Sequence, residues 1–448
     1  MKNFRFLTIF LLVCIISGLF GSAAFADTPA PPVLNAQAAF VGDLTTGKCV
    51  YELNADVQRA PASLTKIMTA LLAVEAVESG KVSLEDMVTV SEDIFIDLAE
   101  DGSGVQLLPG EIMSFSDLLY CALLGSANDA CNVIAMHIAG SVENFVAMMN
   151  ARAADLGCES THFANAHGLP DETHLSTAED LFTIFSEALK HELFITVSST
   201  AKHSTFPTNV SPARMLSNTN ALINRDSAYG KGYVYQPAFC GKTGHTEAAG
   251  YCLISAAEKD GIRLCTVVLG CTDDSSGSTP VICSFRDSIA LYDWVFGSFS
   301  YVTLLTANMK LAEVEVSMGE EAAVGVCASS DITVLLPNDT DTDSFITLMD
   351  TGNEAPVAPI TAGQILGKVS VTDSEGNVLG SAKLLSEKAI ALDGGSLLKD
   401  RLGAFLGHTW LLILLVAIFL IVVVYIILAV RYRKKRKAQL RRKAAAGK

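Results

Sequence analysis

The sequence comprises 448 residues, half of them hydrophobic, with a formal net charge of −16 at pH 7. Two basic residues near the start and ten in the segment 431–448 leave 20 basic against 48 acidic residues between 27 and 430, a net charge of about −28. A body this acidic repels phosphate backbones, which argues against a nucleic-acid partner.

The first 26 residues have the composition of a secretory signal peptide. Lys2 and Arg5 precede an apolar run at 6–20, and Ala24-Phe25-Ala26 supplies small residues for cleavage. We therefore expect residues 1–26 to be a signal peptide and the mature protein to lie outside the cytoplasm.

The next feature is an apolar stretch, 64–77, that contains Lys66. A helix that is hydrophobic around most of its circumference runs through the interior of a domain. Burying an ammonium group there is costly unless the group is paired or neutral. Ser63 lies three residues earlier and so shares a helical face with Lys66. A desolvated lysine that accepts the hydroxyl proton would make Ser63 an activated nucleophile.

The spacing Ser-x-x-Lys occurs three times, so the motif alone is weak. Ser199 and Lys202 lie in a polar run, and Ser396 and Lys399 lie just before a long apolar segment. Only Ser63 opens a long apolar helix. Taken by itself, the first motif still leaves open a helix cap beside a solvated lysine.

Up to residue 298, the spacing of the apolar residues alternates between the strand period and the helix period. Strands are predicted at 38–43 and 49–52, and two apolar strands at 249–257 and 262–270 are joined by a hairpin turn. Ser176 to Glu179 has the pattern of a capping box. Strands at both ends with helices between them favour an α+β fold, in which an antiparallel sheet from distant parts of the chain lies beside a helical region. The helices expected after the first span 115–124, 129–138, 142–156, 176–189 and 284–296.

A second domain is predicted at 299–395, after a first domain at 27–298. Short apolar runs there are separated by Gly, Asp, Asn and Pro, which is typical of a small all-β domain. We interpret it as a spacer or docking module. Its strands are expected at 314–316, 323–327, 332–336, 364–371 and 377–385.

The segment 409–430 carries no charge and is long enough to form a transmembrane helix. The basic tail 431–448 follows directly and, by the positive-inside rule, lies in the cytoplasm. We therefore expect a single-pass protein of the cell membrane with an extracytoplasmic body.

Ten cysteines follow the signal segment, and no two form a Cys-x-x-Cys pair. This argues against zinc, and we expect no metal and no cofactor. Disulfides are permitted in an exported protein, but buried thiols that act as small hydrophobes fit equally well.

Two further motifs carry polar groups. Ser126 and Asn128 stand two residues apart between helical segments, where they could cap a helix or serve a site. Lys242-Thr243-Gly244 leads into the hairpin and presents a cation, a hydroxyl and a glycine that lets a ligand approach the backbone. The alternative is a solvated strand edge with Lys242 facing water.

In this order, Ser63-x-x-Lys66, Ser126-x-Asn128 and Lys242-Thr243-Gly244 resemble the three signatures of penicillin-binding proteins and serine β-lactamases. The segments 62–69, 165–170 and 242–251 look most like the low-molecular-weight D-alanyl-D-alanine carboxypeptidases. The resemblance covers roughly residues 34–296. It implies a β-lactamase/transpeptidase-like domain, with an antiparallel sheet flanked by helices plus a helical subdomain, before the small all-β domain and the transmembrane helix.

The resemblance also implies catalytic roles. Ser63 would attack the carbonyl between the two terminal D-alanines of a peptidoglycan stem peptide, with Lys66 as its base, and water would hydrolyse the acyl-enzyme. Ser126 would relay the proton to the leaving amine, and Asn128 would hold Lys66. Penicillin and other β-lactams, which mimic the D-Ala-D-Ala end, would acylate Ser63 and leave slowly.

Substrate binding is implied at the third motif. Lys242, Thr243 and Gly244 would hold the terminal carboxylate, together with Arg263 from the neighbouring strand. The backbone N–H groups of Ser63 and His245 would form the oxyanion hole.

Two rival interpretations remain open. A class A β-lactamase needs a glutamate after the second motif to activate the deacylating water, and Glu172 is a candidate. A non-catalytic peptidoglycan-binding or sensor protein would not be acylated by penicillin. The chain departs from the family in its end, because many members carry an amphipathic helix where this sequence predicts a membrane span.

Overall fold

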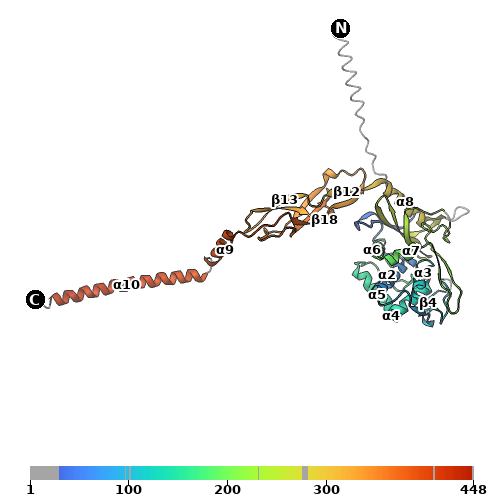
Figure 1. The fold of residues 1–448 in the computed structure, drawn as a ribbon, viewed down its shortest axis with the longest axis horizontal. Helices are drawn as coiled ribbons and strands as arrows, with labels where there is room; N and C mark the ends of the chain where they lie inside the picture. Colours follow the sequence, from blue (N-terminus) through green and yellow to red (C-terminus); the bar gives the residue numbers. More distant parts are fainter. Residues whose placement is uncertain are drawn as a thin grey trace, which may run out of the picture. The chain divides into compact units, whose positions relative to one another are not determined.

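The computed structural model describes residues 30–445 except 96, 100, 101, 231, 275–280, 407 and 408. The predicted signal peptide, 1–26, lies outside the described residues. The chain divides into two compact units (Figure 1). The first runs to Val302 and includes Leu335–Thr340, and the second comprises Thr303–Val334 and the chain from Asp341 onward.

The first unit contains an antiparallel sheet, as expected, and the sheet has five strands, one more than the four predicted. Its order, β2-β1-β9-β8-β7, brings strands from both ends of the unit together and leaves β7 at an edge. The strands are β1 (Ala38–Asp43), β2 (Cys49–Leu53), β7 (Ala238–Thr246), β8 (Gly250–Lys259) and β9 (Ile262–Cys271).

The central strands are apolar on both faces because both faces are covered. Successive side chains point to opposite sides of a strand. Ile254 and Val267 join the hydrophobic cluster of the helical region, whereas Leu253 and Val268 join a cluster with α8 (Cys283–Ser298). This double burial explains the nearly continuous apolar runs in β8 and β9.

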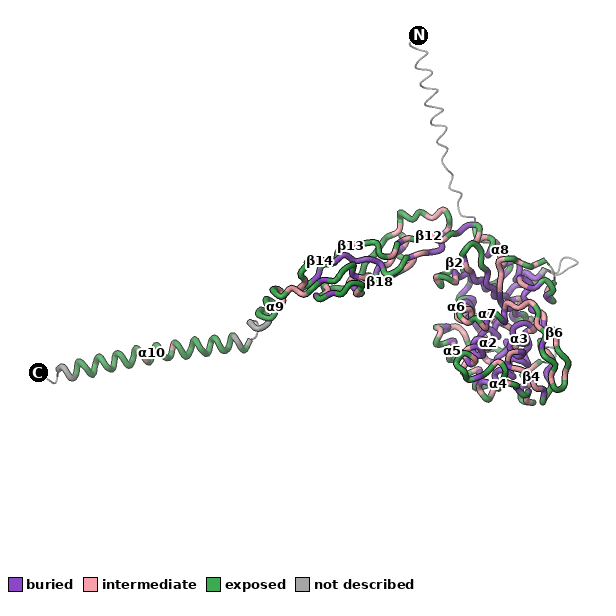
Figure 2. The backbone as a smooth tube through the Cα atoms, viewed as in Figure 1, coloured by how far each residue is buried: buried purple, intermediate pink, exposed green. Residues whose placement is uncertain are grey.

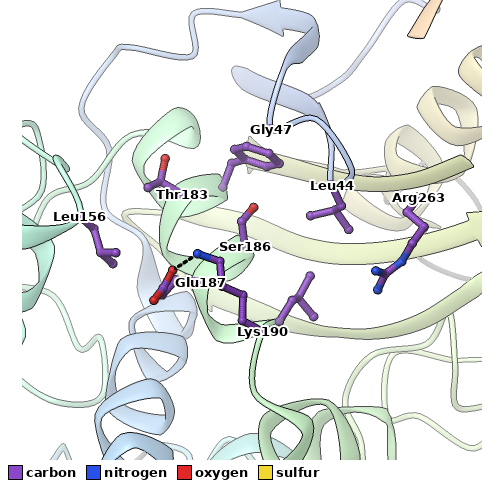
Figure 3. Close-up of a pocket in the computed structure, with 10 residues that line it drawn as sticks. Leu44, Gly47, Leu156, Thr183, Ser186, Glu187, Lys190 and Arg263 are labelled. Atoms are coloured by element: carbon purple, nitrogen blue, oxygen red, sulfur yellow. Dashed lines mark hydrogen bonds and ion pairs between the residues drawn. The ribbon is translucent and has the colours of Figure 1, made fainter. Parts of the chain in front are cut away.

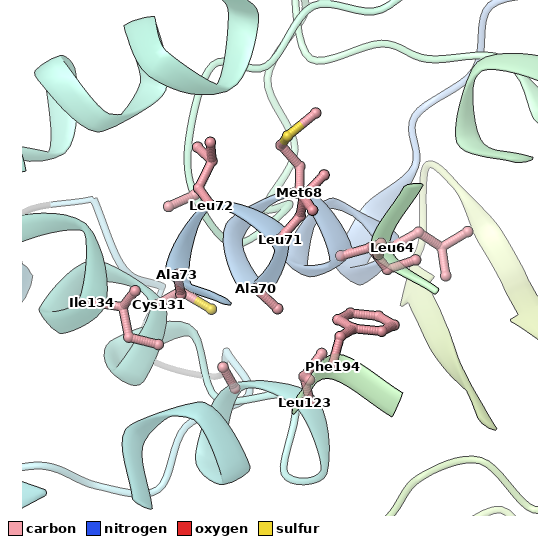
Figure 4. Packing of buried hydrophobic residues seen from close by; sticks show 14 of the residues in the cluster. Leu64, Met68, Ala70, Leu71, Leu72, Ala73, Leu123, Cys131, Ile134 and Phe194 are labelled. Atoms are coloured by element: carbon pink, nitrogen blue, oxygen red, sulfur yellow. The ribbon is translucent and has the colours of Figure 1, made fainter. Parts of the chain in front are cut away.

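The helical region is built around α2 (Lys66–Glu78), which is buried along most of its length (Figure 2). Its side chains pack with Leu123, Ile134 and Phe194 from three neighbouring helices (Figure 4). The predicted helix therefore exists, although its first turn is a separate 3₁₀ turn, η1 (Ala62–Thr65). The other helices are α3 (Phe115–Leu123), α4 (Asn128–Ala139), α5 (Val142–Asp155), α6 (Ala178–Ala188) and α7 (Glu192–Ser199).

The capping box predicted at Ser176 is wrong by one residue. Thr177 caps α6, and its hydroxyl accepts the Asp180 N–H at 3.1 Å. Ser176 is held elsewhere, because its backbone bridges to Arg59 and its hydroxyl hydrogen-bonds Thr161 at 2.8 Å. Helix α7 is an element that the sequence pattern did not predict.

Short elements complete the first unit around this core. They are η2 (Glu92–Phe95) and the pairs β3 (Met87–Thr89) with β4 (Ile112–Ser114), β5 (Lys202–Ser204) with β6 (Met215–Ser217), and β10 (Asp273–Asp274) with β11 (Val281–Ile282).

The second unit is built on strands, as predicted. Its antiparallel sheet has the order β13-β14-β18-β17-β16 and includes the edge strand β16, which is exposed at all five residues and was not predicted. The sequence of β16, Ile-Thr-Leu-Met-Asp, alternates over only three residues, which is too short a run to predict a strand. The strands are β12 (Phe299–Leu305), β13 (Lys310–Glu315), β14 (Ala323–Ala328), β15 (Ile332–Pro337), β16 (Ile346–Asp350), β17 (Ile365–Thr372) and β18 (Val378–Ser386), with a short helix η3 (Thr342–Ser344).

Two helices follow the strands, α9 (Gly394–Leu406) and α10 (Thr409–Ala445). Within α10, the stretch Leu412–Arg442 is long and apolar enough to cross a membrane. All ten described cysteines are free thiols, so they form no disulfide framework. Nine are buried and act as small core residues, whereas Cys49 is exposed.

Candidate active site

Ser63 lies half-buried in the 3₁₀ turn that leads into α2. The residue before it, Ala62, has φ +48°, a left-handed conformation that non-glycine residues seldom adopt. Thr65 supports the turn, because its hydroxyl donates to the Ala62 carbonyl at 2.8 Å and contacts His174 at 2.7 Å. The nucleophile candidate is therefore held on a strained and firmly fixed turn.

Lys66 is fully buried and has three oxygen neighbours. Its Nζ lies 2.8 Å from Ser63 Oγ, 2.7 Å from Asn128 Oδ1 and 2.6 Å from the carbonyl oxygen of His167. Burial lowers the pKa of Lys66 from 10.5 to about 8, against the opposing effects of Cys131 and Asp129. At pH 7 about one lysine in ten is then neutral, compared with about one in 3,000 at the ordinary pKa.

The three oxygen neighbours of Lys66 can accept the three N–H bonds of the ammonium form, and they also suit a neutral amine. A neutral amine has two N–H bonds and one lone pair, whereas an ammonium has three donors and no acceptor. Asn128 Oδ1 and the His167 carbonyl accept the two N–H bonds, because neither can donate. The lone pair then faces Ser63, whose hydroxyl is the one neighbour with a proton to give. The geometry therefore suits proton transfer from Ser63 to Lys66.

Ser126 and Lys242 form a second buried pair beside the first. Lys242 donates from Nζ to Ser126 Oγ at 2.9 Å and to the Thr243 carbonyl at 2.9 Å. Burial, followed by repulsion from Lys66, holds the pKa of Lys242 well below its ordinary value. Ser126 has φ +54° and does not cap α4, whose N-cap residue is Ala127. The capping interpretation of Ser126 and the solvent-facing interpretation of Lys242 are both wrong.

Strand β7 carries the third motif along the edge of the sheet next to the Ser63 turn. A Cβ atom at Gly244 would lie 3.0 Å from the Pro61 carbonyl oxygen and 3.2 Å from the Ser63 nitrogen, so glycine permits this close approach. Thr243 is 4% exposed and contacts the Thr219 hydroxyl at 2.6 Å. His245 is exposed, and its ring stacks on Tyr251 with centroids 4.1 Å apart.

Arg263 is the one predicted site residue that the structure places elsewhere. It lies at the hairpin end of β9, opposite Glu258, whereas Lys242 pairs through Ile254 with Val267. Four residues of strand separate Val267 from Arg263, about 13 Å. Arg263 lines a separate cavity of about 490 Å³ with Leu44, Ser186 and Glu187 (Figure 3). It therefore cannot help Lys242 and Thr243 to hold one carboxylate.

Two contributors to the site were missed in the sequence. The His167 carbonyl holds Lys66, but a main-chain atom leaves no trace in the residue type. Gly168, with φ +91°, follows it and marks an unusual backbone at this place. Thr219 belongs to no motif, and only its contact with Thr243 in the folded chain places it at the site.

The described residues include one group of potential metal ligands, Glu75, Glu187 and His191. Arg152 already donates to Glu75 Oε1 at 2.7 Å and to Glu187 Oε1 at 2.9 Å. A guanidinium therefore neutralises both carboxylates. Glu75 also lies nine residues beyond Lys66 on α2, about 13 Å along the helix.

Comparison with known proteins extends these observations to most of the chain. Residues 25–273 match the family model of D-alanyl-D-alanine carboxypeptidases, peptidase family S11, and residues 299–391 match the C-terminal domain of penicillin-binding protein 5. The chain is 31% identical to the D-alanyl-D-alanine carboxypeptidase DacF of Bacillus subtilis, over 84% of this chain and 92% of that protein. It is 32% identical to DacC of Escherichia coli, over 78% and 84% of the two chains.

Solved structures give the same result. Penicillin-binding protein 5 from Haemophilus influenzae superposes with a TM-score of 0.66 at 28% identity, covering 81% of this chain and 99% of that chain. Both the sequence and the fold thus align over the catalytic region and the strand domain, and the chain belongs to the D-alanyl-D-alanine carboxypeptidase family of low-molecular-weight penicillin-binding proteins.

Proposed function

We propose that this chain is a serine carboxypeptidase that removes the terminal D-alanine from peptidoglycan stem peptides ending in D-Ala-D-Ala. The observation that carries the proposal is the buried Lys66 amine, 2.8 Å from Ser63 Oγ and with both its other partners able only to accept. In this family such a serine forms the acyl-enzyme, and family membership makes the chain a hydrolase of that type.

The proposed reaction begins with proton transfer from Ser63 to Lys66. The Ser63 oxygen bonds to the carbonyl carbon of the penultimate D-alanine, and the backbone N–H groups of Ser63 and His245 stabilise the oxyanion. The proton reaches the leaving amine through Ser126, the C–N bond breaks, and D-alanine departs. Water then attacks the ester, releases the shortened peptide and restores the serine hydroxyl.

We place the substrate along the free edge of β7. An extended peptide can add to an edge strand through main-chain hydrogen bonds. Its terminal carboxylate would meet Lys242 and the Thr243 hydroxyl, with the Thr219 hydroxyl beside it. An arriving carboxylate favours the charged form of Lys242, whose pKa is otherwise depressed by burial. Arg263 has no part in this binding.

We also propose that α10 anchors the enzyme in the cell membrane. Its apolar part is long enough to span a bilayer, and the basic tail that follows favours a cytoplasmic C-terminus. The catalytic unit would then face the cell wall, where its substrate lies.

Release of D-alanine tests the proposed activity. The full chain in detergent, incubated with a stem pentapeptide, is expected to release D-alanine, measured by amino-acid oxidation or chromatography. Ser63→Ala should abolish release because the acyl-enzyme cannot form. Ser199→Ala, in the second Ser-x-x-Lys segment at the end of α7, should leave release unchanged. Binding of the pentapeptide without release by the unaltered chain would refute the proposal.

The fate of penicillin separates this activity from that of a β-lactamase. Glu172, the candidate for activating the deacylating water, is exposed to solvent. We therefore expect a long-lived penicilloyl adduct on Ser63, detectable by mass spectrometry, and not rapid turnover of the antibiotic.

The rate of penicillin acylation should follow the ionisation of Lys66. Its pKa is about 8, and the neutral form is the proton acceptor. The rate constant is expected to rise about tenfold per pH unit below pH 7 and to level off above pH 8 to 9. Circular dichroism at each pH checks that the protein stays folded. A profile that is flat between pH 6 and 9 would contradict a Lys66 base.

A further inference from the structure

The His167 carbonyl that holds Lys66 is itself fixed through the His167 ring. The ring is 1% exposed, and both its nitrogens have partners. Nδ1 accepts the Leu169 N–H at 3.2 Å, and Nε2 lies 3.2 Å from Asp97 Oδ2. Because Nδ1 is an acceptor, the ring proton lies on Nε2 and is donated to the Asp97 carboxylate.

The ring is neutral in this arrangement. Burial lowers the pKa of His167, although Asp97 opposes the shift. The charged or titratable groups around the ring are Asp97, Lys66 and His174. Protonation of Nδ1 would break the bond from Leu169, so the neutral tautomer is the one that fixes the peptide next to Lys66.

Asp97 is in turn held by α4. Asn132 is fully buried and donates from Nδ2 to Asp97 Oδ1 at 2.7 Å and to the Ile94 carbonyl at 2.9 Å. Asn132 lies one helical turn after Asn128, which accepts from Lys66. Helix α4 therefore holds Lys66 in two ways. Asn128 contacts the amine directly, and Asn132 acts on it through Asp97 and His167.

We propose that Asp97 is a positioning residue for Lys66 that acts through the His167 peptide. The inference rests on the proposed role of Lys66 as proton acceptor for Ser63. Asp97 touches neither reacting atom, but it fixes the carbonyl that takes one of the two amine protons. Without Asp97, the His167 carbonyl is held less firmly. The lone pair of the Lys66 amine then points at Ser63 for a smaller fraction of the time.

If Asp97 only stabilised the fold, its removal would lower the melting temperature. Its carboxylate is 40% exposed, so water can replace it as the acceptor for His167 and Asn132, and its hydrogen bonds contribute little to stability. The loss of Asp97 should therefore appear in the acylation step and not in unfolding.

The test measures penicillin acylation of the full chain in detergent by stopped-flow fluorescence, which separates initial binding from the acylation rate constant. Asp97→Ala is expected to slow acylation about tenfold without weakening initial binding. Asp97→Asn should restore most of the rate, because its amide oxygen can accept the His167 Nε2–H. Asp93→Ala removes an exposed carboxylate from η2 nearby and should match the unaltered chain.

Three outcomes would overturn the inference. The first is an Asp97→Ala rate within about twofold of the unaltered chain. The second is a fall in the acylation rate constant that comes with a melting temperature clearly below that of Asp93→Ala. The third is an Asp97→Asn variant as slow as Asp97→Ala. If the unaltered chain is not acylated at all, the proposed function fails first, and this inference falls with it.

Discussion

Replacement of Lys66 by methionine is expected to slow acylation of Ser63 by penicillin by a factor of roughly 10² to 10⁴, the usual contribution of a positioned general base. Methionine keeps most of the length and apolar stem of lysine but cannot accept a proton. Stopped-flow acylation or intact-protein mass spectrometry measures the change. The rise of the rate with pH should also disappear, because the titrating group has been removed.

A matched control is present in the same chain. Lys202 follows Ser199 at the same spacing, but it is exposed and pairs with Asp226 at 2.7 Å. Lys202→Met should acylate at the rate of the unaltered chain. If Lys66→Met kept more than about a tenth of the rate, Lys66 would not be the principal proton acceptor.

Lys66→Met should also change how the unfolding free energy depends on pH. The folded pKa of Lys66, about 8, lies below its ordinary value of 10.5, so between these values the unfolded chain binds the extra proton. The unfolding free energy of the unaltered chain, relative to Lys66→Met, should therefore rise with pH across this window, by up to about 3 kcal/mol. The thiols also titrate at high pH, but both proteins contain the same thiols. Their contribution to the unfolding free energy therefore cancels in the comparison.

Gly168→Ala is the second change with a large expected effect. Gly168 has φ +91°, and an added Cβ would overlap the Ala62 carbonyl and lie 2.9 Å from Thr65 Oγ1. Both neighbours belong to the turn that carries Ser63, so they can yield only by moving the nucleophile. We expect a fall in acylation of about a hundredfold, since a displacement near 1 Å at a reacting group has this effect.

Backbone strain alone can be separated from this steric effect. Gly157 has φ +80°, and a Cβ added there would meet no atom within 4 Å beyond its chain neighbours, so Gly157→Ala carries the strain without the overlap. It should lower stability by about 1 kcal/mol and leave the acylation rate of the folded protein unchanged. Equal acylation rates for the two variants would show that Gly168 does not shape the Ser63 turn.

The sequence pattern predicted the parts of the site that depend on local periodicity. A lysine within an apolar run, three residues after a serine, implied a buried amine facing a hydroxyl, and both features are present at Ser63 and Lys66. The strands at both ends of the first unit likewise implied the antiparallel sheet. These predictions succeed because helix and strand periods are set by neighbouring residues.

The errors arise where distant residues decide the outcome. Arg263 lies on a strand next to β8, but the hairpin register places it opposite Glu258, away from Lys242. Thr177 displaces Ser176 as the cap of α6 because Ser176 bridges to Arg59, far earlier in the chain. Strand β16 was missed because its sequence alternates over only three residues.

By itself, the sequence determined which side chains are available and which of them lie on buried elements, because composition and periodicity act over a few residues. Only the tertiary structure decided what those side chains can do. Lys66 meets Asn128 and His167, which are 62 and 101 residues away, and Lys242 meets Ser126 across 116 residues. Burial among these partners lowers the lysine pKa, and that change turns a serine and a lysine into a nucleophile and its base.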